Sequence, residues 1–122
     1  MATTDTCCTI VPYLQIHPGK REAFLTLCQK FVEKTKQEPN CLYYGWTFDG
    51  DLVHCREGYK DADAALAHLQ NVGALLEELT KIVDITRFEV HGPAQELAKL
   101  RKPLADANLT TQYFTLEYGF RK

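Results

Sequence analysis

The segment REGYKDADAALAHL, residues 56–69, brings a carboxyl, a phenol and an imidazole close together in the chain. Glu57 lies near the end of an apolar run, Tyr59 follows it, and His68 lies in a helix that Asp61 is suited to begin. A carboxyl group among aromatic side chains is desolvated, which raises its pKa and suits it to proton transfer. We therefore take Glu57 and His68 as candidate acid–base residues.

Both residues also have an ordinary structural interpretation. Glu57 could pair with Arg56 or Arg87, or accept a hydrogen bond from the backbone near the helix start. A lone histidine in a helix is more often a packed or surface residue than a catalyst. The two interpretations differ in where the imidazole points: towards the sheet, it borders the same gap as Glu57, and towards solvent, it does not.

Aromatic residues surround this segment in the predicted structure. Trp46, Tyr44 and Tyr59 share one predicted strand face with Glu57. They are candidate substrate-binding residues, because flat side chains can wall a pocket for a planar molecule. Core packing is the alternative, since strands favour aromatic residues with or without a ligand. His17, His54 and His91 have no metal-ligand spacing and receive no role.

Hydrophobic periodicity places the elements that position these residues. Asp49-Gly50 between two apolar runs predicts a hairpin with a two-residue turn, which puts Leu42 on the same face as Glu57. Pro12 predicts a local irregularity in the first strand, and Pro103 is expected to end the last helix. Strands are predicted at 7–16, 42–48, 52–59, 83–91 and 111–120, and helices at 19–37, 62–71, 74–82 and 94–102.

This order predicts an α+β fold of the ferredoxin-like βαββαβ type, with one antiparallel sheet and its helices on one face. We expect a single domain over residues 1–122, with a core at about 8–91 and a C-terminal helix and strand extension at 92–122. Val11 and Tyr13 put apolar surface on the other face, where a second copy is the simplest cover. The sequence therefore predicts a homodimer, and the strand at 111–118 could cross to the partner.

Composition narrows the functional classes. A net charge of −2 and scattered basic residues argue against binding to nucleic acid or to a membrane surface. The first residues do not resemble a secretion signal, so we expect a cytoplasmic protein whose five cysteines are reduced. Nucleotide-binding and nucleophile-elbow motifs do not occur, and no cofactor or metal is expected.

Three segments, VPYLQIHPGKREAF, EPNCLYYG and EGYKDADAALAHL, together resemble the antibiotic biosynthesis monooxygenase family. The resemblance covers about residues 8–91. Asn40 stands where the family usually has glycine, and Tyr59 where tryptophan is common. The matching residues are Pro18, Gly19, Phe24, Pro39, Cys41, Tyr44, Glu57, Ala64 and His68.

The resemblance implies a dimeric α+β barrel but leaves the chemistry open, because one fold hosts many functions. The family includes cofactor-independent quinol or anthrone monooxygenases, heme-degrading enzymes, a phospho-sugar isomerase and proteins without an assigned reaction. The heme-degrading members use an asparagine, a tryptophan and a histidine, and their tryptophan lies in the helical region after the hairpin. Heme degradation is disfavoured here, since Trp46 is the single tryptophan and lies in the hairpin itself. The expected function is oxidation of a small phenolic or quinol-type compound by O₂, with a non-catalytic binding or interaction module or an isomerase of a small polar substrate as alternatives.

Overall fold

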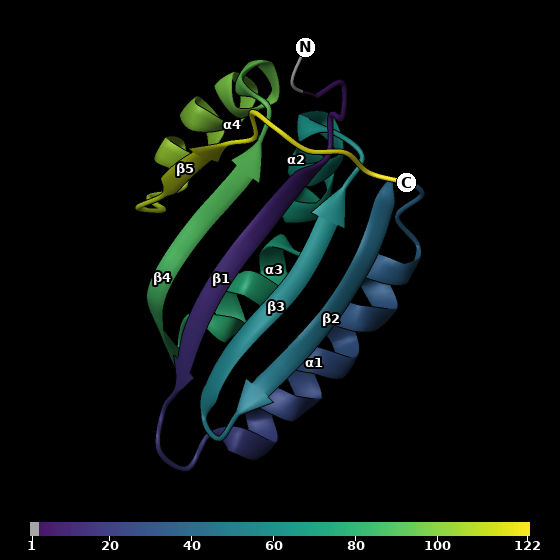
Figure 1. The fold of residues 1–122 in the computed structure, drawn as a ribbon. Helices are drawn as coiled ribbons and strands as arrows, with labels where there is room; N and C mark the ends of the chain where they lie inside the picture. The colour runs from purple at the N-terminus through teal and green to yellow at the C-terminus, as the bar shows by residue number, and fades with distance from the viewer. Residues whose placement is uncertain (1–2) are drawn as a thin grey trace.

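The computed structural model describes residues 3–122, which form an α+β ferredoxin-like fold with a five-stranded mixed sheet (Figure 1). No helix of this part of the chain is long and apolar enough to cross a membrane. Its elements are β1 (Cys8–Ile16), α1 (Arg21–Lys36), β2 (Cys41–Asp49), β3 (Leu52–Tyr59), α2 (Ala62–Asn71), α3 (Gly73–Leu79), β4 (Val83–Gly92), α4 (Ala94–Asp106) and β5 (Gln112–Thr115).

The strands lie in the order β2-β3-β1-β4-β5. All pairs among the first four strands are antiparallel, while β5 runs parallel to β4. In Figure 1, helices α1, α2 and α3 lie behind the sheet, and no helix lies in front of it. The predicted βαββαβ core with its helices on one face is therefore confirmed, and the extension adds a parallel edge strand.

Strand β1 forms the centre of the sheet and shows why the inner face is apolar. Cys8, Ile10, Leu14 and Ile16 are all buried against the helices. Their alternation continues through Pro12, but the register with β4 shifts between Tyr13 and Leu14, where β4 holds one extra residue, Thr86. The irregularity predicted at Pro12, which cannot donate a ladder hydrogen bond, is thus found beside it, but its extra residue belongs to β4.

The β2–β3 hairpin differs from the prediction in its register. Asp49 pairs with Leu52, so the turn residues are Gly50 and Asp51 rather than Asp49 and Gly50. Gly50 has a φ of 60°, the conformation that the first turn position of a type II′ hairpin needs. Compared with the predicted hairpin, the pairing of the two strands is displaced by two residues. Because side chains alternate between faces, each one keeps its predicted face.

A second irregularity in β2 contradicts the prediction for Leu42. The pairing with β3 shifts between Cys41 and Tyr43, which turns Leu42 away from the inner face. Its side chain is 41% exposed instead of facing Glu57. Tyr44 is the residue that pairs with Glu57.

Helix α2 carries His68, and two carboxyl groups hold its N-terminus. The Asp61 side chain accepts a hydrogen bond from the Ala64 N–H at 2.9 Å. The Glu96 side chain, from α4 in the extension, accepts one from the Ala62 N–H at 2.9 Å. First-turn N–H groups have no partner within the helix, so these bonds satisfy them and fix where α2 begins.

The extension differs from the prediction in two places. Helix α4 continues past Pro103 to Asp106, with the proline on its exposed side. Pro103 has no N–H, so the carbonyl of Lys99, four residues earlier, lacks its usual helix donor. This carbonyl lies on the exposed side of the helix, where water reaches it. Strand β5 is short and pairs with β4 of its own chain, leaving Tyr118 and Phe120 more than 80% exposed.

The cysteines lie at buried or half-buried positions. All five are free thiols, and Cys8 and Cys55 are fully buried in the core. Burial raises the pKa of Cys8 to about 12, so this thiol behaves as a small apolar side chain rather than a nucleophile.

The cap of α2 gives a test of how the helix is positioned. We expect Asp61→Ala to lower the free energy of unfolding by about 1 kcal/mol, because the Ala64 N–H loses its acceptor. Asp63→Ala is the matched control, since Asp63 is exposed in the same turn and makes no capping bond. Urea unfolding of both variants measures the difference, and equal losses would contradict this role of Asp61.

Candidate active site

A cavity of about 360 Å³ lies between the inner face of the sheet and the helices. Most of its walls are aliphatic or aromatic. Glu57 and His68 lie together in the lining and form its polar end, and the exposed Glu77 and Thr80 also border it. Its lining residues are Ile10, Pro12, Leu14, Phe31, Tyr44, Trp46, Glu57, His68, Leu69, Leu76, Glu77, Leu79, Thr80, Ile85, Phe88, Ala107 and Leu109.

Glu57 projects from β3 into this cavity and is only 6% exposed. The hydroxyl group of Tyr59 donates a hydrogen bond to its Oε1 at 2.6 Å. Neither candidate arginine pairs with it: Arg56 stacks on the ring of Tyr43 at 4.7 Å, and Arg87 pairs with Glu89. The salt-bridge interpretation of Glu57 is therefore wrong.

His68 faces the sheet rather than solvent and is 3% exposed. Its Nδ1 lies 2.8 Å from Oε2 of Glu38, and its Nε2 lies 3.5 Å from Oε1 of Glu57. The short contact assigns the Nδ1 proton to the bond with Glu38. Nε2 then presents a lone pair towards Glu57, at a distance that a small movement converts into a hydrogen bond.

Burial moves the two ionisable groups towards their neutral forms. Desolvation raises the pKa of Glu57 to about 7, although the hydrogen bond from Tyr59 acts in the opposite direction. Desolvation also lowers the pKa of His68, against the opposing effect of Glu38. At neutral pH the cavity therefore holds a carboxyl group close to its midpoint and an uncharged imidazole.

Glu38 completes the set and was not predicted from the sequence. It lies between α1 and β2, and its side chain is mostly covered. Asn71, at the end of α2, donates a hydrogen bond to its Oε2 at 2.8 Å. Glu38, His68, Glu57 and Tyr59 thus form a continuous polar chain that begins near the surface and ends beside the cavity.

The predicted aromatic residues gather at the same place in two layers. Tyr44 and Trp46 line the cavity, and the Tyr44 ring centre is 5.4 Å from that of His68. Tyr59 is fully buried behind Glu57, with its ring 4.9 Å from His68, and does not line the cavity. Burial raises the pKa of both tyrosines, so neither phenol is suited to act as a base at neutral pH.

The structure therefore brings all five predicted site residues together, with Tyr59 one layer behind the other four. Within residues 3–122, no group of three or more His, Cys, Asp or Glu side chains is arranged to hold a metal ion. Besides Glu38, sequence reasoning missed Ala107 and Leu109 of the extension. Their only signal is an apolar residue, Leu109, within the polar segment DANLTTQ.

The chain shares this fold with several solved structures. MupZ from Pseudomonas fluorescens is 46% identical over 95% of this chain and 94% of its own, with a TM-score of 0.87. A conserved protein from Methanosarcina mazei is 22% identical over 70% of this chain and 89% of its own, with a TM-score of 0.64. An antibiotic biosynthesis monooxygenase is 24% identical over 68% of this chain and 92% of its own, with a TM-score of 0.60.

No curated protein is significantly similar to the chain. The model of the antibiotic biosynthesis monooxygenase family matches residues 8–76, more than half of the sequence. This match contains the hairpin, Glu57 and His68, which build the polar end of the cavity. The chain belongs to the antibiotic biosynthesis monooxygenase family.

Proposed function

We propose that this protein is a cofactor-independent monooxygenase that oxidises a small phenolic or quinol-type compound with O₂. The observation that carries the proposal is the buried Glu57, which has no cationic side chain beside it and stands at the polar end of an apolar cavity. A carboxyl group with a pKa of about 7 exchanges a proton readily at neutral pH, as an acid–base catalyst must.

In the proposed reaction, ionised Glu57 removes the phenolic proton of the substrate. The proton can pass to Nε2 of His68, while Glu38 stabilises the resulting imidazolium through Nδ1. The electron-rich anion reacts with O₂ at a ring carbon that carries hydrogen and forms a peroxide there. One oxygen atom remains as a carbonyl and the other leaves as water, so that a phenol and O₂ yield a quinone and H₂O.

The walls of the cavity support an aromatic rather than a small polar substrate. Phe31, Tyr44 and Trp46 present rings, and aliphatic side chains form most of the remainder. Such walls exclude water and bury an apolar ring, which favours binding and protects a reactive anion. A small polar substrate, as in the isomerase alternative, would leave most of these apolar walls unmatched, although Glu77 and Thr80 also line the cavity.

A second candidate keeps the same residues but does not use O₂. Because the pKa of Glu57 is about 7, half of the molecules carry a proton there at that pH and can act as a general acid. Isomerisation of an apolar substrate by proton transfer would need nothing more from the site. A non-catalytic binding module is less well supported, since its cleft would not need a buried carboxyl group linked to a histidine.

The acid–base roles can be tested with a panel of phenols, naphthols and anthrone. We expect Glu57→Gln and His68→Ala each to lower kcat by at least about 100-fold, because each removes one group of the proton path. Glu78→Gln and His17→Ala are matched controls at exposed or partly exposed positions whose side chains do not line the cavity. O₂ consumption and product absorbance provide the readout.

The outcomes separate the two candidates. If turnover continues without O₂ and is lost in both variants, the protein is a proton-transfer enzyme and not a monooxygenase. Unchanged turnover in both variants would move the chemistry away from Glu57 and His68 altogether.

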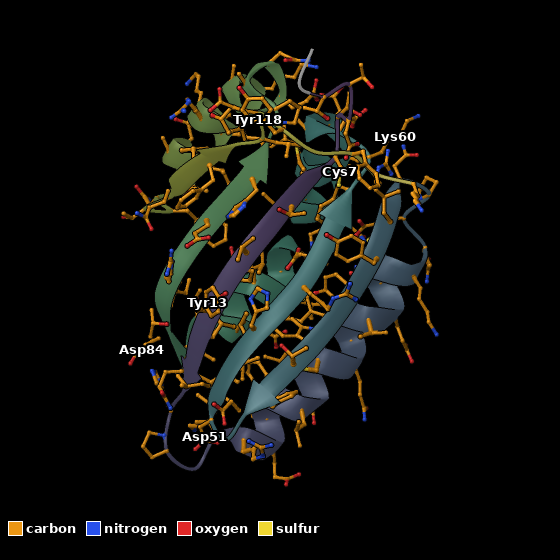
Figure 2. The ribbon with its side chains drawn as sticks, in the orientation of Figure 1. Cys7, Tyr13, Asp51, Lys60, Asp84 and Tyr118 are labelled. Carbon is orange, nitrogen blue, oxygen red and sulfur yellow. The ribbon has the colours of Figure 1, made fainter. Side chains whose placement is uncertain are left out.

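We also propose that the open face of the sheet forms a homodimer. Tyr13 lies on this face, is 41% exposed and stacks on His54 at 4.6 Å, while Leu52 is 50% exposed (Figure 2). Exposed apolar residues that gather on one face of a small protein indicate an interface.

Light scattering at micromolar concentration should give twice the chain mass of 13.9 kDa, about 27.8 kDa. Tyr13→Asp should lower this mass towards that of the monomer, because burying an unpaired carboxylate is costly. Lys30→Asp on the exposed side of α1 should leave it unchanged. A wild-type monomer at this concentration would refute the dimer.

A further inference from the structure

The C-terminal extension supplies part of the cavity wall. Ala107 and Leu109 are lining residues, yet they follow α4 and lie beyond residues 8–76, which match the family model. The two relatives below 25% identity leave about 30% of this chain uncovered, whereas MupZ covers 95% of it. This wall therefore comes from outside the part of the chain that the family model matches.

The end of α4 fixes the direction of Leu109. Asn108 has a φ of 59°, the left-handed conformation that ends many helices. Its N–H donates to the carbonyl of Ala105 at 3.0 Å, and the N–H of Leu109 donates to that of Leu104 at 3.1 Å. This pair of bonds is the Schellman motif, in which the residue after the left-handed one packs back onto the helix. Leu109 is thus held by the backbone.

The elements on both sides of Leu109 are anchored as well. Leu97, Leu100 and Leu104 of α4 are buried in the core beneath the sheet. The guanidinium group of Arg101 lies 4.2 Å from the ring centre of Tyr113, which joins α4 to β5. Strand β5 in turn pairs with β4, so the turn that carries Leu109 is attached at each end.

Beyond Leu109 lies a second, more open hollow. It runs beside the part of β4 that precedes the pairing with β5. Ile85, Phe88 and Leu109 line both this hollow and the cavity, so they form the boundary between the two. The other residues of the hollow are Thr86, Arg87, Asn108, Thr110 and Gln112.

We propose that Leu109 is a specificity-determining residue that separates the cavity from the hollow and limits the length of the bound molecule. The inference rests on the proposed function in one respect, that the cavity is the substrate site. The ligand class is a phenolic head, placed at Glu57 and His68, with an apolar tail that points towards Leu109. Shortening Leu109 joins the cavity to the hollow and admits longer tails.

The test is the binding of 4-alkylphenols with tails of two to nine carbons, measured by calorimetry. In the wild type, affinity should rise about fourfold with each buried methylene until the tail reaches Leu109, and then level off. Leu109→Ala should extend the rise by about two or three carbons, the length of the side chain it removes. Leu109→Phe should end the rise earlier.

Leu116→Ala is the matched control, a partly buried leucine of the same extension that does not line the cavity. It should retain the wild-type length limit, and circular dichroism checks that every variant is folded. The proposal is overturned if Leu109→Ala and Leu116→Ala have the same limit.

Failure of the proposed function would look different. If no phenol binds to the wild type, the proposed phenolic part of the ligand is wrong. Straight-chain 1-alkanols, which lack the phenol ring, then measure the length limit of the cavity. A change in the fluorescence of Trp46, the single tryptophan and a lining residue, reports their binding. A shift of the alkanol limit in Leu109→Ala supports the proposal, and the absence of binding or of a shift overturns it.

Discussion

The site depends on a carboxyl group that has been removed from water without a cation to neutralise it. Glu57 is almost fully buried, and its close partners are the neutral hydroxyl group of Tyr59 and the imidazole of His68. An arginine in the same place would keep the carboxyl ionised far below neutral pH. Arg56 and Arg87 instead contact Tyr43 and Glu89, which leaves the pKa of Glu57 near 7.

The surrounding fold maintains this arrangement from several distant parts of the chain. The hairpin places Tyr44 opposite Glu57, and the capped start of α2 directs His68 towards the sheet. Glu38 and Asn71 hold the outer side of the imidazole. The extension contributes twice, because Glu96 binds the N-terminus of α2 and Leu109 lines the cavity. Helix α4 is therefore part of the support of the site.

Strand alternation explains how much of the site could be predicted from the sequence. Tyr44, Trp46 and Glu57 were placed on one face correctly even though the hairpin turn is Gly50-Asp51, because a shift by an even number of residues preserves the face. Leu42 was misplaced, since nothing in its neighbours signals the bulge.

Long-range packing explains what the sequence could not predict. Glu38 stands 30 residues before His68, and its contact depends on how α1 ends beside α2. Leu109 depends on the extent of α4, which continues through Pro103, where propensity favours a stop. The position of β5 is similarly set by tertiary contacts, including the stacking of Tyr113 with Arg101.

The most direct test of the account is the ionisation of Glu57 itself. Carboxyl-carbon NMR of protein labelled with ¹³C-glutamate, with Glu57→Gln to assign the signal, follows this single group across the pH range. We expect its midpoint near pH 7, so that the group is mostly protonated at pH 6 and mostly ionised at pH 8. A midpoint near 4.5, the ordinary value for glutamate, would contradict the account, because Glu57 would then be an ionised residue without the proposed desolvation.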